Sequence, residues 1–119
     1  MRIWTAALAA TVLATGFGAA QAHPKLLTSN PAAGARLRAP AVVRLSFSET
    51  LIPKFCKIAL AGPSGAPVRL GPSTVSADRK QLAAAIQQKL GPGAYKVSWQ
   101  AVSTDTHHVH GGYAFTVTP

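Results

Sequence analysis

From residue 42 onward, hydrophobic and polar residues alternate with a period of two in short runs separated by turn residues. In the first run, Val43, Leu45 and Phe47 face one way and the residues between them face the other. Similar alternation recurs in three later segments, residues 58–60, 95–101 and 113–117. Turns rich in Gly and Pro separate these runs. Short alternating strands bounded by turns are typical of an antiparallel β-sandwich or barrel.

One segment carries a conflicting signal. Residues 78–90 have the composition of a helix, and Leu82, Ile86 and Leu90 recur at helical spacing. The same segment also alternates between apolar and other positions with a period of two. Because strands are expected on both sides of it, we predict a strand over residues 80–87.

The stretch from Leu90 to Tyr95 contains a tight Gly-Pro-Gly turn and leads into a strand that begins with a tyrosine. This arrangement resembles the tyrosine corner of immunoglobulin-like sandwiches, in which the phenol bonds back to the preceding turn. A plain core tyrosine is compatible with the same pattern.

The first 22 residues have a different pattern. Arg2 is followed by an uncharged apolar stretch from Ile3 to Ala20, and Ala20-Gln21-Ala22 is the small-x-small pattern of a signal peptidase site. We therefore expect residues 1–22 to be a cleaved signal peptide and residues 23–119 to be one exported domain, periplasmic where the cell has that compartment. No later apolar stretch is long enough to span a bilayer, so we expect no stable membrane insertion after processing.

The net charge is +9, and loss of Arg2 lowers it to +8. The basic residues are scattered, and no aromatic residues interleave with them as a base-stacking platform would require. We therefore expect no nucleic-acid partner and interpret the charge as a solvated surface, with weak attraction to anions as the lesser alternative. We expect the processed protein to be a monomer.

Cys56 is the only cysteine, so no internal disulfide can form. We interpret it as a small buried hydrophobic residue on a strand. The alternatives are a soft metal ligand or a thiol that pairs between molecules.

Cleavage after Ala22 would make His23 the first residue of the finished protein. An N-terminal histidine offers a metal its imidazole and its α-amine together, which closes a chelate ring. An α-amine has a pKa of about 7.7–8.0, so a metal displaces its proton readily at neutral pH. The alternative is that His23 is simply an inert, frayed terminus.

Three of the four histidines cluster between Ser103 and Gly112, beside one of only three acids. Asp105 and His107 are two residues apart, so extended backbone presents both side chains on one side. With His23 they supply two imidazole nitrogens, one amine nitrogen and one carboxylate oxygen. This donor set suits Cu(II) best and Ni(II) next. Because Met1 is the only methionine, the processed chain also lacks the thioethers that Cu(I) prefers.

Three further residues have open roles. We expect His108 and His110 to lie in a solvated surface loop, although together they could form a weak second metal site. Glu49 follows the strand predicted over residues 42–48. It is either an exposed acid at the end of that strand or an outer-shell acceptor or weak axial ligand of the metal.

Together these residues resemble the CopC family of exported copper-binding proteins. The resemblance rests on an ordered set of positions through the processed chain: His23, Asn30-Pro31, Leu45 to Glu49, Gly91 to Trp99, Ser103 to His107, and Gly111 through Phe115 to Val117. It implies a seven-stranded Greek-key β-sandwich of immunoglobulin type. It also implies a Cu(II) site made by His23, Asp105 and His107 with Glu49 close by, and a role in copper tolerance beside an inner-membrane protein of the CopD type.

The chain departs from this family at several points. The methionine-rich Cu(I) site of some members is missing, Thr106 stands where glycine is usual, and His108 and His110 replace residues that are not ligands. Two alternative functions remain open. One is a histidine-brace copper enzyme of oxidative type, and the other is an immunoglobulin-like interaction module without metal.

Overall fold

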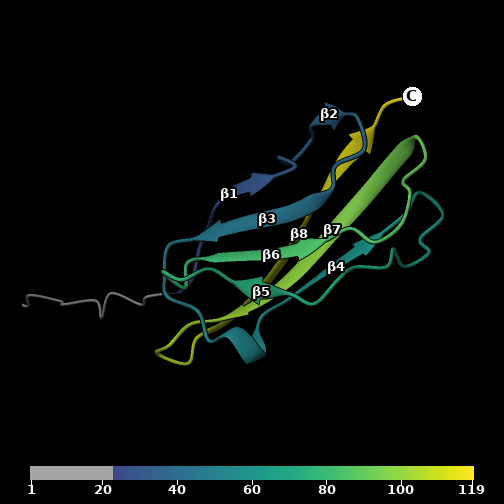
Figure 1. Cartoon of the computed structure of the whole chain (residues 1–119). Helices are drawn as coiled ribbons and strands as arrows, with labels where there is room; N and C mark the ends of the chain where they lie inside the picture. The colour runs from purple at the N-terminus through teal and green to yellow at the C-terminus, as the bar shows by residue number, and fades with distance from the viewer. Residues whose placement is uncertain (1–22) are drawn as a thin grey trace, which may run out of the picture.

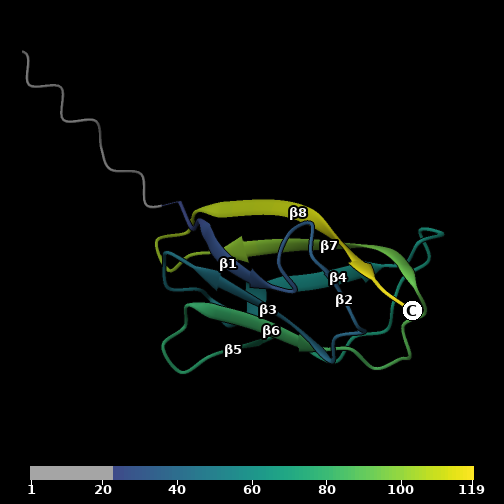
Figure 2. The ribbon, with the colours of Figure 1, turned by 90° about the horizontal axis from the view of Figure 1, so that it is seen from above.

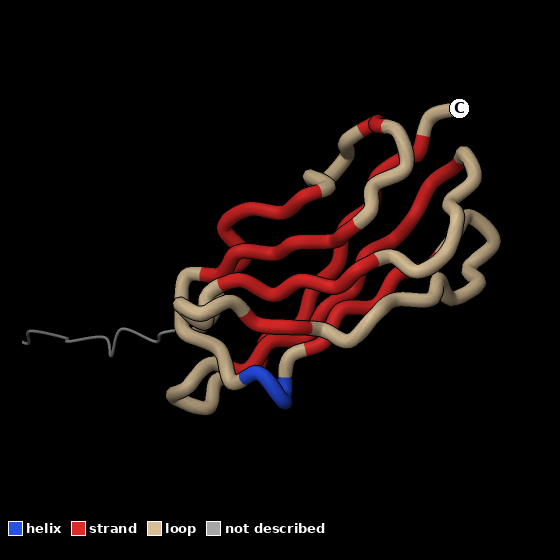
Figure 3. Tube along the Cα trace, in the orientation of Figure 1, coloured by secondary structure: helices blue, strands red, loops and turns tan. Residues whose placement is uncertain are grey.

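The structure, a computed structural model, describes residues 23–119. The predicted signal peptide, residues 1–22, lies outside the described residues. Two four-stranded sheets pack face to face (Figures 1 and 3). The strands of the first sheet are, in spatial order, β1 (Leu26–Asn30), β3 (Val42–Phe47), β6 (Gln81–Ala85) and β5 (Thr74–Val75). Those of the second are β2 (Arg36–Leu37), β8 (His108–Val117), β7 (Gly93–Val102) and β4 (Lys57–Ala61).

This architecture confirms the predicted all-β sandwich. The resemblance implies seven strands, whereas residues 23–119 contain eight, of which β2 and β5 are only two residues long. One short 3-10 helix, η1 (Pro53–Phe55), precedes β4. All neighbouring strands run antiparallel except β2, which pairs in parallel with the end of β8.

The predicted alternation places the core between the sheets. In β3, Val43, Leu45 and Phe47 are buried and Arg44 is exposed. Alternate residues of β4, β7 and β8 close the core from the opposite sheet. The period of two therefore identifies the buried face of each long strand.

The ambiguous segment forms a strand. Leu82 and Ala84 of β6 are buried, and β6 pairs with β3 on one side and β5 on the other. A central position in the sheet satisfies the backbone groups of β6 from both sides, and this outweighs the helical propensity of its alanines.

The tyrosine corner is also confirmed. The Tyr95 hydroxyl donates a hydrogen bond of 2.7 Å to the Gly91 carbonyl, and the Tyr95 ring stacks on Phe115 of β8 with centroids 5.7 Å apart. This fixes the turn that starts β7.

β7 and β8 form the longest pairing, from Gly93 opposite Val117 to Val102 opposite His108. In the middle of this hairpin, Trp99 lies opposite Gly111 and packs edge-on against Phe47 of the other sheet, with centroids 5.0 Å apart. A Cβ atom at Gly111 would lie 2.6 Å from the indole, so this position requires glycine. The hairpin carries the loop with the predicted metal ligands at its open end.

Candidate metal site

Three segments that are distant in sequence meet at one end of the sandwich. The start of the described chain and the β7–β8 loop lie at this end, and the C-terminus lies at the other (Figure 2). Lys25 is held at the end of β3 because its amide donates to the Ser48 hydroxyl and its carbonyl accepts from the Ser48 amide, both at 2.9 Å. The residue that follows His23 and Pro24 is therefore fixed beside the segment that contains Glu49.

A second set of contacts fixes the β7–β8 loop against the same segment. The Thr104 amide donates to the Thr50 carbonyl at 2.9 Å, and the two threonine hydroxyls are hydrogen-bonded at 2.8 Å. Leu51 forms a β-bridge with Ser103. Residues 48–51 thus connect the N-terminal segment to the loop.

The loop itself, residues 103–107, is a tight turn. The Thr106 amide donates to the Ser103 carbonyl at 2.8 Å, and the Ser103 amide donates to the His107 carbonyl at 3.0 Å. Thr106 has a φ of +70°, in the left-handed region that favours glycine. The threonine therefore adopts a strained conformation that a glycine would take freely.

Asp105 and His107 lie together within this loop. Asp105 Oδ2 is 3.1 Å from His107 Nδ1, and Asp105 Oδ1 accepts a hydrogen bond from the Ser103 hydroxyl. The pKa of Asp105 is lowered, first by the Ser103 hydroxyl and then by His107. The carboxylate is therefore ionised at neutral pH. The side chains of His107 and Asp105 remain 38% and 46% exposed, so the pair lies at the surface of the molecule.

The contact between His107 and Asp105 is an approach of charged and polar atoms rather than an aligned hydrogen bond. His107 Nδ1 is shielded from solvent and has no hydrogen-bond partner of acceptable geometry. A buried ring nitrogen without such a partner is costly unless another group satisfies it. A metal ion between the nitrogen and the carboxylate would do so.

His23 lies beside the same pair. Its ring centroid is 4.7 Å from that of His107, and the two rings are inclined at 64°. The residue predicted to become the N-terminus thus lies within reach of the loop near the other end of the sequence.

Side chains alone do not complete a metal site. Among residues 23–119, no three side chains of His, Cys, Asp or Glu are grouped so that they could hold a metal ion. The side chains of His23, Asp105 and His107 therefore do not by themselves form such a group. The predicted ligand set adds a fourth donor, the α-amine that cleavage after Ala22 would create.

The other candidate residues lie on segments other than this loop. Glu49 is adjacent to Ser48 and Thr50, and within residues 23–119 its carboxylate makes no hydrogen bond or ion pair. His108 and His110 are exposed, as expected, but the prediction of a surface loop is wrong, because both belong to β8. Gly111 and Gly112 have the composition of a turn, but they continue the strand opposite Trp99 and Ser98.

The residues that position the predicted ligands do not stand out in the sequence. Ser103 is 1% exposed and orients Asp105, Ser48 holds the N-terminal segment, and Thr50 holds Thr104. Serine and threonine are common at such positions, and only the polar Ser103 directly after a buried strand offered a signal.

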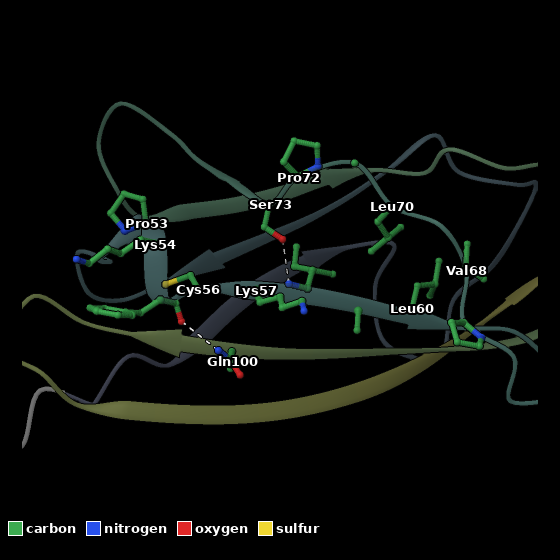
Figure 4. A pocket seen from close by; sticks show the side chains of 15 residues that line it. Pro53, Lys54, Cys56, Lys57, Leu60, Val68, Leu70, Pro72, Ser73 and Gln100 are labelled. Carbon is green, nitrogen blue, oxygen red and sulfur yellow. Dashed lines mark hydrogen bonds between the residues drawn. The ribbon is translucent and has the colours of Figure 1, made fainter.

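A separate hollow in the described part of the molecule lies between β4 and the segment after it (Figure 4). It has a volume of about 550 Å³, and its lining includes Cys56, Leu70 and Gln100. Cys56 is buried, as predicted, but the expectation that it lies on a strand is wrong, because it caps η1 just before β4 begins at Lys57. Its thiol donates to the Ile52 carbonyl at 3.3 Å, and burial raises its pKa. Burial therefore disfavours the thiolate form that a metal ligand requires.

No helix within residues 23–119 has the length and apolar character needed to cross a bilayer.

Comparison with known proteins agrees with this description. The CopC domain model matches residues 26–118. Copper resistance protein C from Pseudomonas syringae pv. tomato is 39% identical over 104 residues, which cover 82% of each chain. Copper resistance protein C from Escherichia coli is 38% identical over 105 residues, which cover 82% of this chain and 83% of the relative.

Solved structures show the same fold. PcoC, a methionine-rich copper resistance protein from Escherichia coli, superimposes with a TM-score of 0.73 at 38% identity, over 82% of this chain and all of PcoC. CopC from Methylosinus trichosporium OB3b gives a TM-score of 0.75 at 30% identity, over 82% of this chain and 95% of that one. From the matched domain, the level of identity and the shared sandwich, this chain belongs to the CopC family.

Proposed function

We propose that this protein is exported, binds Cu(II) and sequesters or carries it in the periplasm, in support of copper tolerance. The ligands are the imidazole and α-amine of His23, the carboxylate of Asp105 and the imidazole of His107. The observation that carries this proposal is the proximity of His23, His107 and Asp105, at 4.7 Å between rings and 3.1 Å between Nδ1 and Oδ2. The names of its relatives, copper resistance proteins, support the choice of metal.

Each residue has a separate task in this site. The two donors of His23 chelate the ion, Asp105 supplies negative charge, and His107 supplies a second imidazole. Three nitrogens and one oxygen suit the tetragonal geometry that Cu(II) prefers. Glu49 lies on the segment that connects the two halves of the site and would act as an outer-shell acceptor or weak axial ligand.

The oxidation state follows from the ligands that are absent from the sequence. The processed chain contains no methionine, unlike the methionine-rich PcoC, and its one thiol is buried. Soft ligands select Cu(I), so this chain should prefer Cu(II).

We propose binding rather than catalysis. In a histidine-brace oxidase, oxygen needs an equatorial position on copper, and Asp105 would occupy that position here. The copper would instead pass to or from another protein, and an inner-membrane protein of the CopD type is the partner we propose. No nucleic acid takes part, and the carrier is a monomer.

Titration of the processed protein with Cu(II), followed by electron paramagnetic resonance, tests this assignment. His107→Ala and Asp105→Ala should each weaken the tight binding of one Cu(II) by about tenfold to a hundredfold, since each removes a ligand. Asp78→Ala is a matched control, because Asp78 also accepts a hydrogen bond from a serine two residues before it but lies in another turn. The ligand assignment would be wrong if Asp78→Ala or His108→Ala weakened the tight site as much as His107→Ala.

A further inference from the structure

The outer face of β8 carries two imidazoles that are not part of the site above. His108 and His110 are exposed, while Val109 between them packs against the core. The pairing of β8 with β7 places Val102 opposite His108, Ala101 opposite Val109 and Gln100 opposite His110. The position of Val109 in the sandwich therefore keeps both histidines on the solvent face.

Strand geometry brings these two side chains together. Residues two apart on a strand are separated by about 6.6 Å at Cα and point the same way. Their imidazoles can lean together until two nitrogens are about 3 Å apart, as ligands at about 2.0 Å from one ion require. In a flexible loop this pairing would have to be formed anew for each ion.

Gln100 supplies a third donor next to them. Its amide nitrogen donates a hydrogen bond of 3.4 Å to the Phe55 carbonyl, and Figure 4 shows the amide oxygen on the opposite side of the group. The oxygen is thus left available as a ligand. Gln100, His108 and His110 line one hollow of about 310 Å³ on the surface of the sheet.

We propose that His108 and His110, with the Gln100 oxygen, form a second binding site for a borderline divalent metal such as Cu(II), Ni(II) or Zn(II). Imidazole nitrogens suit these ions, and water would complete the coordination. All three protein donors are neutral, and Lys57 of β4 lies opposite Gln100 on its other side. The site is therefore weaker than the one at His23.

The two sites are independent in this arrangement. His107 and His108 are adjacent in sequence, but His107 lies in the loop and is turned toward Asp105, whereas His108 is the first residue of β8. Filling the first site would not occupy any donor of the second.

Zn(II) titration followed by the NMR signals of the imidazoles tests the second site. The background is processed protein with one glycine inserted before His23, which removes the proposed terminal chelate. Zn(II) should shift the signals of His108 and His110 together. Replacing both residues, His108→Gln with His110→Gln, should weaken Zn(II) binding, measured by calorimetry because the reporting imidazoles are gone, by about tenfold or more. Circular dichroism verifies that the variant is folded. An unchanged affinity for Zn(II) in the double variant would overturn the proposal.

A gain of affinity provides a second test. Gln100→His places a third imidazole directly opposite His110. It should therefore tighten Zn(II) binding at this site by about tenfold. Ala94→His is the matched control, since it adds an exposed histidine on the same face of β7 opposite Thr116, six residues away. Equal effects of the two substitutions, or no tightening by Gln100→His, would contradict the proposal. Because every variant shares this background, differences among them report on the second site and not on the site at His23.

Discussion

The hydroxyl of Ser103 donates a hydrogen bond to Oδ1 of Asp105, two residues later in the β7–β8 loop. This contact leaves Oδ2 turned toward Nδ1 of His107 at 3.1 Å. It is also the first cause of the lowered pKa of Asp105. A buried serine therefore fixes the direction of a proposed copper ligand and favours its ionised form.

Replacing this serine should weaken copper binding without removing any ligand. Ser103→Ala frees the carboxylate to rotate and lets the pKa of Asp105 rise toward its ordinary value of 3.8. In the unsubstituted protein, the lowered pKa of Asp105 stabilises the fold at pH values above the unfolded pKa of 3.8. This stability is lost as the pH falls through the lowered pKa of the folded state. The variant should bind Cu(II) about tenfold more weakly, measured by competition with a chelator of known affinity.

Ser76→Ala provides the control for this prediction. The Ser76 hydroxyl donates to Asp78 Oδ1 in the same local geometry, and it also lowers the pKa of that carboxyl. Copper affinity should not change in this variant. A loss of the same size in both variants would mean that Ser103 acts only through general stability.

Thr106 should be a site where a glycine stabilises the protein. At a φ of +70° a threonine is strained by about 1–2 kcal/mol. The only cost of a glycine at this position is the larger conformational entropy that it loses on folding. Thr106→Gly should therefore raise the free energy of unfolding by about 0.5–1 kcal/mol in urea denaturation. Thr104→Gly should do the opposite, since it removes the hydroxyl bonded to Thr50. A destabilised Thr106→Gly variant would show that the loop relaxes the strain in another way.

Gly111→Ala should disturb the packing of Trp99. The new methyl group would lie 2.6 Å from the indole and would force it away from Phe47. We expect a loss of about 2 kcal/mol in the free energy of unfolding, typical of overpacking. Trp99 is the only tryptophan of the processed chain, so its fluorescence should shift as well. Gly91→Ala, where a Cβ atom meets nothing within 4 Å, should be tolerated. Equal behaviour of the two variants would contradict this account.

The Cys56 thiol should be inert in the folded protein. Burial raises its pKa above the ordinary value of 9.0, so the neutral thiol predominates at pH 8. Alkylation should be slow in buffer and fast in denaturant. Because the pKa of Cys56 is higher in the folded protein than in the unfolded chain, the buried neutral thiol contributes its full stability below the unfolded pKa of 9.0. This contribution is lost as the pH rises through the pKa of the folded state, so the protein should become less stable above about pH 9. Rapid alkylation of native protein would show that the thiol is accessible.

The sequence was sufficient to predict most of the sandwich. Alternation identified the buried residues of β3 and β7, because the side-chain period of a strand is local and fixed. The tyrosine corner at Tyr95 and Gly91 followed from a short turn pattern. Strand β6 was resolved only by its neighbours, since its own residues fit a helix equally well.

The positioning contacts could not be predicted in this way. Ser48 holds Lys25, and Thr50 holds Thr104, across separations of 23 and 54 residues. No local pattern reveals which hydroxyls meet at such distances. The assignment of His108 and His110 to a loop was wrong because Gly111 and Gly112 resemble a turn. In the strand, they make room for Trp99 and for the neighbouring backbone.

The central claim is that processing creates a chelate at His23 that joins Asp105 and His107 around one Cu(II). The most direct test compares the Cu(II) affinity of processed protein that begins at His23, verified by mass spectrometry, with the same protein carrying one extra glycine before His23. The insertion keeps every side chain but moves the free amine away from the imidazole. We predict that affinity for the first Cu(II) falls by at least about a hundredfold. Equal affinity of the two proteins would contradict the proposed site.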